Sequence, residues 1–574
     1  MTSTHKARPA LFSASRQLML GSAALATVLI VTQAGADLTQ AEIDAARSHA
    51  YDLAGSGQCA QAMPIWERLA RARSSAVDFI DAANCAVETG DAQRAVNNLW
   101  DAVRRRDQLS AEQQLYALRA LGYQAEAVGD WDKALIGWEY ASRISGDGFD
   151  QLQAARASRL SGRVRSAEAR LMEIDAGTLQ GDQLASYYDE RAQVLRQQQP
   201  AAAASYMERA IALDDQAWRR FDRALMLDAA GQTDAAIAEY RTVLSRDPGN
   251  MDVQLSLAYA LRRTGGDAEA AELFRAVMAR DPSRSDLNED LGYALKDAGD
   301  REGASEAFRR AIDRLHSQGV SSDDERLTRF RNEVTELDRS VYGYAYYTWR
   351  DAGTSISNGV QTSAAYSSLG GEINWRPDSL YQDGRGLSFY GRAYTAIDPG
   401  TFNFDGDSTQ AGLGVRYKPF SAHDFSLSAE RLVALGDDAR DDWLLRASYG
   451  WTDGYGWEGR EDSWNYTSLY ADLAYIPGDD EFFGAYLQAR QGRRFPVADN
   501  WAVTPYMTVI GQYADDNFGS QEQWEAGPGV AFTHWFDEDR YHSARKRVDF
   551  EVEYLFDVDG GNDDGVMARV VFGF

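Results

Sequence analysis

The spacing of the apolar residues changes once along this chain, near Arg339, and that change limits the folds open to it. From about residue 40 to residue 335 the chain is rich in Ala, Arg, Leu, Glu and Gln, with apolar residues at helical spacing. Beyond Arg339 it is rich in Tyr, Trp, Phe, Gly, Ser and Thr, in segments of ten to fourteen residues separated by Asp, Gly and Asn. These patterns predict helices followed by strands. We therefore expect an α+β multidomain protein, with helices over residues 37–338 and strands over residues 339–574.

The helical part contains an internal repeat. Three consecutive blocks of 34 residues begin at Ala217, Met251 and Ser285, and positions 8, 20, 24 and 27 of each block are small or apolar. Small residues let the two helices of a hairpin approach closely, an aromatic residue fills the groove between hairpins, and Pro248 and Pro282 end the second helix. The residues at these positions are Ala224, Ala236, Tyr240 and Val243, then Ala258, Ala270, Phe274 and Val277, then Gly292, Ala304, Phe308 and Ala311.

This pattern resembles the tetratricopeptide (TPR) repeat, and weaker copies lie upstream. They are Ala50, Ala62 and Trp66; Ala83, Ala95 and Leu99; Gly122, Ala134 and Trp138; Ala155, Ala167 and Leu171; and, with one residue deleted, Ala192 and Ala203. We expect about eight hairpins stacked as an α-solenoid. TPR arrays bind proteins or peptides on a concave surface, so the resemblance implies partner docking; a spacer role is the alternative.

The chain has two cysteines, Cys59 and Cys85. Cys59 falls near the start of the second helix of the first expected hairpin, and Cys85 falls within the first helix of the next. Stacking of adjacent repeats could bring them together, and an oxidising periplasm favours a disulfide between them. Two buried free thiols are the alternative. Without a nearby His, two cysteines cannot form the usual four-ligand zinc site.

The N-terminus has the composition of a secretory signal peptide. Basic residues precede an apolar run from Leu18 to Val31, and Ala34-Gly35-Ala36 supplies the small residues that a signal peptidase needs. The run is too short to span a bilayer comfortably. We predict a signal peptide over residues 1–36, cleaved after Ala36, and a helical domain in the periplasm. A retained signal anchor is the alternative.

Several segments beyond Arg339 alternate apolar and polar residues. From Val548 to Phe556 one face is apolar, while the other carries Asp549, Glu551 and Glu553. An apolar outside and a polar inside are typical of an outer-membrane barrel, in which every backbone group is satisfied within lipid. We count about twelve antiparallel transmembrane strands, centred near residues 345, 368, 392, 412, 428, 445, 470, 486, 507, 528, 551 and 569. A soluble periplasmic β-sandwich is the alternative.

The alternation also places polar side chains inside the expected barrel. Aromatic faces stack on pyranose rings, while carboxylates and guanidinium groups bind hydroxyls, so these side chains are candidates for contact with a glycan. They are Arg416, Tyr470, Asp472, Tyr486, Arg490, Glu551 and Arg569. At the end of the chain, Val570, Phe572 and Phe574 resemble the signal that barrel-assembly machinery reads, although Arg569 stands where Gly is commonest.

An even strand count conflicts with the lengths of two loops. It places the short turn from Pro477 to Glu481 on the outside and the long segment from Trp451 to Asp462 on the side of the repeats. Outer-membrane barrels usually have short periplasmic turns and longer extracellular loops. The barrel architecture is therefore a firmer expectation than the number of strands.

The last hundred or so residues resemble one family in particular. The segments that carry the resemblance are Tyr475-Ile476-Pro477-Gly478-Asp479-Asp480, Gln491-Gly492-Arg493, Glu525-Ala526-Gly527-Pro528-Gly529 and Trp535-Phe536-Asp537-Glu538-Asp539-Arg540-Tyr541-His542. Together they look like the C-terminal domain of the NfrA family, outer-membrane proteins known as phage adsorption receptors. The resemblance implies helical repeats joined to a barrel, an association with an inner-membrane glycosyltransferase, and a part in surface-glycan export.

Other motifs point to no catalytic, metal or cofactor chemistry. The segment from Gly454 to Gly459 fits GxGxxG, but it joins two expected strands, whereas a dinucleotide site needs a strand and a helix. His534 and His542 flank three acidic residues that could bind a metal, yet a solvated loop is the favoured interpretation. Paired carboxylates lie in expected loops, where calcium is a second interpretation: Asp437/Asp438, Asp441/Asp442, Asp515/Asp516 and Asp563/Asp564. The net charge of −28 opposes binding to nucleic acid.

Two functions follow from these features. The first is an NfrA-like outer-membrane component of a surface-glycan (exopolysaccharide) secretion apparatus. Its barrel would pass or anchor the polymer, its TPR array would recruit periplasmic or inner-membrane proteins, and phage would use it as a receptor. The second is a non-transporting outer-membrane anchor or adhesion protein. A twelve-strand lumen is narrower than that of the open sixteen- to eighteen-strand channels, and this narrowness weakens the case for transport. We do not expect an enzyme.

Overall fold

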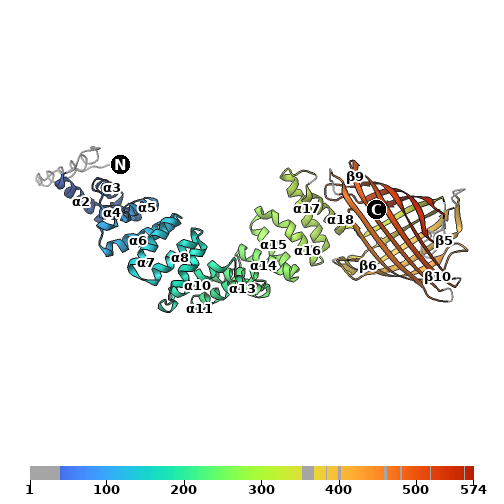
Figure 1. Ribbon diagram of the computed structural model, residues 1–574, viewed down its shortest axis with the longest axis horizontal. Helices are drawn as coiled ribbons and strands as arrows, with labels where there is room; N and C mark the ends of the chain where they lie inside the picture. The colour runs from blue at the N-terminus through green and yellow to red at the C-terminus, as the bar shows by residue number, and fades with distance from the viewer. Residues whose placement is uncertain are drawn as a thin grey trace, which may run out of the picture. The chain divides into compact units, whose positions relative to one another are not determined.

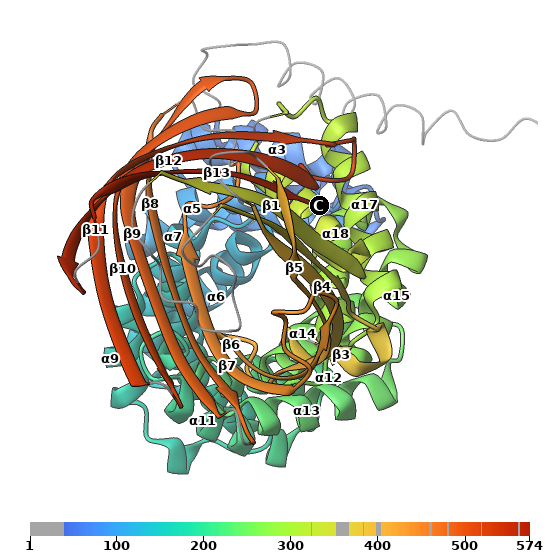
Figure 2. The same ribbon diagram turned by 90° about the vertical axis from the view of Figure 1, so that its right-hand side faces the viewer.

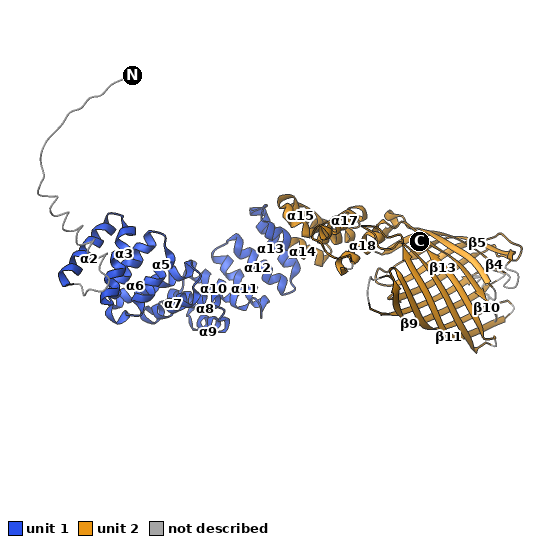
Figure 3. Cartoon of the chain, turned by 90° about the horizontal axis from the view of Figure 1, so that it is seen from above, with its two compact units in different colours: residues 1–256 blue, residues 257–574 orange. Residues whose placement is uncertain are grey.

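The computed structural model describes residues 39–322, 324–351, 367–382, 384–397, 403–457, 462–478, 481–517, 519–560 and 563–574. The expected signal peptide, with its cleavage after Ala36, lies outside these residues. The chain divides into two compact units, residues 1–256 and residues 257–574 (Figure 3). Helix gives way to strand between Asp338 and Val341. The second unit therefore contains the last helices together with the β domain.

The described residues form seventeen α-helices, arranged as a TPR-like solenoid of eight hairpins and one final helix (Figure 1). The first six hairpins are α2 (Gln40–Gly55) with α3 (Cys59–Arg73), α4 (Ala76–Glu88) with α5 (Ala92–Val103), α6 (Ala111–Ala127) with α7 (Trp131–Ser145), α8 (Gly148–Leu160) with α9 (Val164–Glu173), α10 (Asp182–Leu195) with α11 (Pro200–Leu213), and α12 (Ala217–Ala229) with α13 (Thr233–Arg246). Then come α14 (Met251–Thr264) with α15 (Asp267–Arg280), α16 (Asn288–Asp297) with α17 (Arg301–Ser317), and α18 (Glu325–Asp338). The prediction of a solenoid is confirmed.

The small residues of the repeat lie where the two helices of a hairpin touch. A Cβ atom added to Gly122 would lie 2.4 Å from the Trp138 ring, and one added to Gly292 would lie 2.8 Å from the Phe308 ring. At the other copies the position holds a fully buried alanine. The third strict block departs slightly from the expected register, because a 3-10 helix over Pro282–Leu287 delays the start of α16 to Asn288.

A second regularity of the repeat was not part of the sequence pattern. A tyrosine directly after the small position packs edge-to-face against the aromatic residue fifteen positions further on, an arrangement that aromatic rings favour. The ring centroids are 4.5 Å apart for Tyr51 and Trp66, 4.7 Å for Tyr123 and Trp138, 5.3 Å for Tyr259 and Phe274, and 4.9 Å for Tyr293 and Phe308. This contact joins the two helices of one hairpin.

The first unit is also tied together from hairpin to hairpin. Arg47 on α2 pairs with the buried Asp78 on α4 at 2.9 Å, and Arg119 on α6 pairs with the buried Asp150 on α8 at 2.7 Å. Cys59 on α3 and Cys85 on α4 lie with their Cα atoms 4.8 Å apart and are joined in a disulfide. Ion pairs and disulfide therefore act at the interfaces between neighbouring repeats.

The β domain is a closed antiparallel barrel of twelve strands with one further two-residue strand, β3 (Tyr381–Gln382), in the described residues (Figure 2). Closure comes from the pairing of β1 with β13 and of β2 with β4. The strands are β1 (Val341–Arg350), β2 (Ser367–Trp375), β4 (Arg385–Ile397), β5 (Phe404–Lys418), β6 (Asp424–Ala434), β7 (Trp443–Asp453), β8 (Trp464–Ile476), β9 (Phe482–Ala498), β10 (Trp501–Asp516), β11 (Gly519–Phe536), β12 (Lys546–Asp559) and β13 (Gly565–Gly573). The predicted strand count is confirmed.

The two faces of the barrel differ as the alternation predicts. On β5, Leu413 is 67% exposed on the outer face, whereas Gln410 inside is 3% exposed. On β12, Phe550 and Val552 face outwards, and Glu553 inside is buried. Part of the interior is itself apolar, because six side chains near one end of β6 to β10 form a buried cluster: Leu432, Leu444, Ala474, Ile476, Phe482 and Ala514.

We call the end of the barrel where β1 follows α18 the proximal end, and the opposite end the distal end. The β7–β8, β9–β10 and β11–β12 connections lie at the proximal end, and the β8–β9 turn lies at the distal end. The long segment after Trp451 is therefore proximal, as the twelve-strand count requires, and the usual pattern of loop lengths is reversed here. Among the described helices, none has the length and apolar character of a membrane-crossing segment.

Candidate functional site

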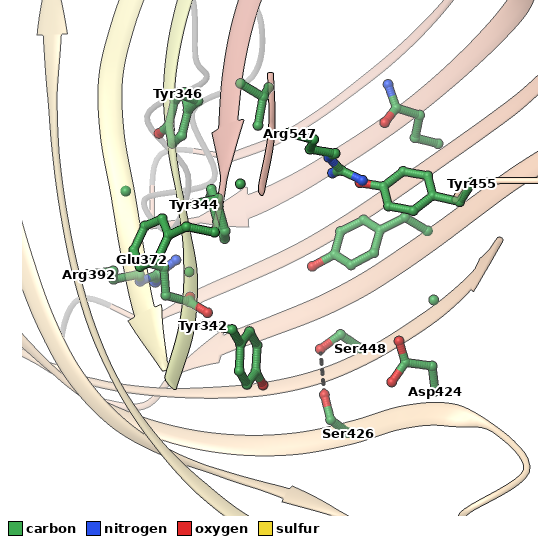
Figure 4. Close-up of a pocket in the computed structure, with 18 of the residues that line it drawn as sticks. Tyr342, Tyr344, Tyr346, Glu372, Arg392, Asp424, Ser426, Ser448, Tyr455 and Arg547 are labelled. Carbon is green, nitrogen blue, oxygen red and sulfur yellow. Dashed lines mark hydrogen bonds between the residues drawn. The ribbon is translucent and has the colours of Figure 1, made fainter. Parts of the chain in front are cut away.

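The candidate site is a cavity of about 1260 Å³ inside the barrel. Its mouth is at the proximal end, where the rim consists of Thr335 and Glu336 of α18, Arg339 directly after that helix, and the segment from Ser543 to Arg547. Its wall continues along β1, β2 and β4 and across to β12 and β13 (Figure 4). The last helix of the repeat array therefore contributes directly to the wall of the barrel cavity.

The lining of this cavity is aromatic and basic. The described lining residues include eight tyrosines, two tryptophans, eleven Arg or Lys residues and four Asp or Glu residues. Further carboxylates that pair with the bases, such as Glu430 and Asp472, are buried in the wall. The surface presented to the cavity is thus rich in ring faces and nitrogen donors, although the whole chain is strongly acidic.

All seven sequence-predicted interior residues lie on the inner face of the barrel. Arg416, Tyr470, Tyr486 and Arg569 line the cavity. The other three, Asp472, Arg490 and Glu551, form ion pairs inside the barrel: Arg446 with Asp472 at 2.7 Å, and Arg490 with Glu551 at 3.1 Å. The interior placement holds for the whole set, and their contact with a glycan stays a prediction.

Several interior ion pairs join strands that are not neighbours in the sheet. Arg350 on β1 pairs with Glu525 on β11, and Arg490 on β9 pairs with Glu553 on β12 at 2.6 Å. Arg392 on β4 pairs with Glu430 on β6 at 2.6 Å. Removing one partner of such a buried pair leaves an uncompensated charge, which is costly. These pairs hold the wall in shape and narrow the space that a polymer could pass.

The sequence pattern missed the interior residues of β1. Tyr342, Tyr344 and Tyr346 all line the cavity, as does Arg350 at the end of the strand. The period-two signal was present, but Tyr347 and Trp349 on the outer face are also aromatic, so β1 shows no contrast between apolar and polar faces. It also missed the acidic partners Glu372, Glu430 and Glu525, because alternation gives the face of a residue and not its partner across the lumen.

Tyr455, Gly456 and Trp457, in the connection from β7 to β8, line the cavity at its proximal mouth. Arg494, which is 3% exposed, donates hydrogen bonds to the carbonyl oxygens of Gly454 and Tyr455 at 3.0 and 2.7 Å. The Arg547 guanidinium lies 3.8 Å from the centre of the Tyr455 ring, and Trp457 packs against Trp464 and Trp535. The segment joins β7 to β8 with no helix after it, so it lacks the setting of a dinucleotide site. Glu458 and Gly459 lie outside the described residues.

Gly454 also shows why this segment needs glycine. It has a φ of +68°, and a Cβ atom there would lie 1.9 Å from the carbonyl oxygen of Asn465. Only glycine fits such a left-handed position against the neighbouring backbone without strain. The glycine that resembled part of a phosphate-binding loop in the sequence therefore serves a tight turn beside β8.

The segment from Trp535 to His542, part of the NfrA-like motif, holds the last helices to the barrel. His542 lies 2.9 Å from Asp338 through Nε2 and 2.8 Å from Asp539 through Nδ1, and the backbone N–H of Ser543 donates to Thr335 at 3.0 Å. Burial opposes ionisation of Asp539, but hydrogen bonds from His542 and from backbone N–H groups lower its pKa to about 2. The pKa of Asp338 is also lowered, because bonds from Ser305, His542 and Arg309 outweigh its burial.

His534 and His542 have different surroundings. His534 stacks between Trp501 and Phe536, with ring centroids 4.3 and 5.4 Å away, on the outer face near the proximal rim. His542 is held by Asp338 and Asp539 as described above. Across the part of the chain that the structure describes, no group of three or more His, Cys, Asp or Glu side chains is placed to hold a metal ion.

The C-terminal residues of the expected assembly signal lie at the closure of the barrel. The N–H of Gly343 donates to the carbonyl oxygen of Phe574 at 2.9 Å, and the N–H of Phe574 donates back to Gly343 at 3.0 Å. Val570 and Phe572 pair with Tyr347 and Ala345 of β1. Recognition by assembly machinery stays a prediction.

Comparison with known proteins shows that part of the barrel is similar to a known family. Residues 402–570 match the family model described as the C-terminal part of bacteriophage N adsorption protein A. This confirms the resemblance to the NfrA family. Over 459 residues the chain is 25% identical to bacteriophage adsorption protein A of Escherichia coli K12, which covers 76% of this chain and 46% of that protein. The chain thus spans about half the length of this NfrA relative.

The solved structures with similarity to part of this chain include two that are described as tetratricopeptide repeat proteins. The C-terminal part of a TPR protein from Cytophaga hutchinsonii is 15% identical, with a TM-score of 0.34, and the match covers 44% of this chain and 99% of that one. A TPR protein from Parabacteroides merdae is 17% identical, with a TM-score of 0.31, and the match covers 42% of this chain and 93% of that one.

Proposed function

We propose that this NfrA-like outer-membrane protein is a component of a surface-glycan secretion apparatus, in which the barrel cavity holds the sugar chain. The observation that carries the proposal is the aromatic and basic lining of the cavity. Ring faces pack on the apolar faces of pyranoses, and guanidinium and amide groups donate hydrogen bonds to sugar oxygens. Such a lining suits a polyhydroxylated ligand better than it suits free passage of ions.

The position of the cavity mouth supports a path from the periplasm. We place the repeat array in the periplasm and the distal end of the barrel at the cell surface. Because Thr335 and Glu336 of α18 form part of the rim, partners that dock on the array would act next to the opening. These partners would be periplasmic or inner-membrane proteins, and the protein itself would act without catalysis.

The relationship to a bacteriophage adsorption protein suggests a second use of the same molecule. We propose that phage adsorb to the distal end of the barrel, which would face the medium. Adsorption serves the virus and not the cell, so it is compatible with a barrel that secretes a glycan and with one that only anchors the repeat array. It predicts that substitutions in distal loops abolish adsorption and leave the glycan unchanged.

A deletion strain and planar bilayers test the secretion proposal together. We expect the surface glycan to fall in the deletion strain and to return when the full chain is supplied. We also expect purified protein to conduct weakly and its current to be blocked by added oligosaccharide. Unchanged glycan in the deletion strain, with a barrel that never conducts, would contradict the proposal.

The interior ion pairs favour one other candidate function. Arg350 with Glu525 and Arg490 with Glu553 lie buried inside a barrel whose strand number already makes its lumen small for transport. A barrel of this kind could serve as an anchor that fixes the repeat array at the outer membrane. In that case the deletion strain keeps its glycan but loses the proteins that the array retains, which fractionation of periplasmic complexes would detect.

A further inference from the structure

We propose that three interior tyrosines of β1, Tyr342, Tyr344 and Tyr346, form a binding track for a saccharide chain. This inference rests on the proposed function and names the surface of the cavity that the sugar would contact. None of the three was among the interior residues expected from the sequence. All of them line the cavity and come from the strand that directly follows α18.

The three rings are spaced along one direction. Residues two apart on a strand face the same side and lie about 6.7 Å apart along it. Figure 4 shows the rings following one another along β1. The centroids of Tyr344 and Tyr346 are 6.3 Å apart with their planes 30° from parallel. A row of ring faces with this spacing offers successive contacts to the successive rings of an extended sugar chain.

These tyrosines differ from the structural tyrosines of the same barrel. Tyr390 and Tyr506 are about 4–5% exposed and donate hydrogen bonds to Glu430 and Glu553 at 2.9 and 2.7 Å. Tyr344 also faces inwards but is 41% exposed. Among the described residues, the hydroxyls of Tyr342 and Tyr344 have no hydrogen-bond partner. A packed interior would bury such groups and satisfy them, so their exposure to the cavity leaves them available to a ligand.

The neighbouring strand makes room for the track. Gly370 of β2 lies opposite Tyr346, and a Cβ atom there would lie 2.7 Å from the Tyr346 hydroxyl oxygen. The Tyr346 side chain thus lies over the backbone of β2, and this contact limits the positions that the Tyr346 ring can take. Any larger residue at Gly370 would push the ring into the cavity.

An unmatched donor lies in the same row as the central tyrosine. Tyr344 pairs in register with Glu372 on β2, which pairs in register with Arg392 on β4. Figure 4 shows Glu372 and Arg392 beside Tyr344. The Arg392 side chain lines the cavity and is only 7% exposed; Nε bonds to Glu430, but Nη2 is buried without a hydrogen-bond partner in the described residues. A buried donor of this kind is costly unless a ligand or water oxygen completes it.

A second unmatched donor lies elsewhere in the lining. The side-chain amide nitrogen of Gln488 on β9 is buried without a partner among the described residues, and Gln488 also lines the cavity. The ligand therefore needs oxygen acceptors as well as apolar ring faces. A saccharide provides both in every residue, which is why we assign this chemistry to the track.

The test compares two tyrosines of one strand in the full chain. Tyr344→Ala removes an interior ring, whereas Tyr347→Ala removes a neighbouring ring that pairs with the outward-facing Leu369. Binding of two probes, maltohexaose and hexagalacturonate, is followed by tryptophan fluorescence of the detergent-solubilised protein. We expect at least one probe to bind the natural protein and Tyr344→Ala to weaken it about tenfold, with Tyr347→Ala unchanged.

Resistance of each variant to SDS at low temperature is the control, because it shows that the barrel is folded. Retained affinity in Tyr344→Phe supports stacking as the dominant contact. Equal affinity in Tyr344→Ala and Tyr347→Ala overturns the track, and so does the absence of binding by both probes to the natural protein. The proposed function is judged separately by the surface glycan of the deletion strain, so the two failures are distinguishable.

Discussion

Nε2 of His542, in the connection between β11 and β12, lies 2.9 Å from Oδ2 of Asp338, the last residue of α18. The same imidazole contacts Asp539 through Nδ1 at 2.8 Å. One side chain thus links the final helix of the repeat array to the loop that carries the NfrA-like motif. The strength of this junction should depend on the charge of the two carboxylates.

Acid should loosen the junction. In the folded protein the pKa of Asp539 is about 2 and that of Asp338 is also lowered, whereas an unfolded Asp titrates near 3.9. A lowered pKa contributes stability that is complete above the unfolded value and is lost as pH falls towards the folded value. We expect the contact to persist from pH 7 to about 4 and to weaken between about 4 and 2. The weakening would be measured by hydrogen exchange of the α18 amides, corrected for the pH dependence of the intrinsic exchange rate. In the Asp539→Asn variant these amides should exchange faster than in the natural protein already at pH 7.

Arg494 should control access to the cavity from the proximal end. It donates hydrogen bonds to the carbonyl oxygens of Gly454 and Tyr455, so Arg494→Ala should free the segment that lines the proximal mouth. We expect a higher single-channel conductance than that of the natural protein. Arg493→Ala is the matched control, because Arg493 is exposed and bonds to Ser463 instead. Equal conductance in the two variants would show that the segment does not restrict the lumen.

The ion pair between Arg350 and Glu525 should be needed for barrel stability. Both side chains are buried, at 6% and 1% exposure, so Arg350→Ala leaves a carboxylate without its partner. Breaking such a buried pair costs about 3–5 kcal/mol of unfolding free energy. Urea unfolding in lipid vesicles, followed by tryptophan fluorescence, would measure the loss. Arg310→Ala is the control, because it breaks an exposed helical pair with Glu306 and should cost less than about 0.5 kcal/mol of unfolding free energy. Unfolding of the helices in this control is followed by circular dichroism.

Gly122 should not tolerate a methyl group. In Gly122→Ala the new Cβ atom would lie 2.4 Å from the Trp138 ring, so α6 and α7 must separate. Overpacking of this kind costs about 1–3 kcal/mol. We expect a lower melting temperature of the helical circular dichroism signal. Gly55→Ala is the control, since an added Cβ atom there meets nothing within 4 Å; an equal loss in both variants would contradict the close approach.

Sequence periodicity predicted the main elements of the fold because each is set by local spacing. The 34-residue blocks placed Ala224 and Tyr240 in a buried contact region, and alternation placed Glu551 inside the barrel and Phe550 outside. The twelve strand centres fall within the observed strands. These features depend on which face of an element is buried, and a single segment carries that information.

Long-range partners could not be read in the same way. Arg350 and Glu525 are separated by 175 residues, and only closure of the sheet brings them together. Alternation along β9 places Arg494 on the same face as Arg490, but its partners, the carbonyl oxygens of Gly454 and Tyr455, lie in a connection that has no periodic signal. The tyrosines of β1 were hidden by aromatic neighbours on the opposite face. The residues that define the cavity are thus those whose role depends on topology rather than on spacing.

The pairing of β1 with β13 has a consequence for biogenesis. About two hundred residues separate these strands in the chain, so a nascent barrel keeps two unpaired edges until its last strand arrives. Open edges recruit other strands and promote aggregation. The completed helices precede β1, which leaves the exposed edges as the vulnerable part of the intermediate. Escort by chaperones should therefore be needed for the β domain and dispensable for the helices.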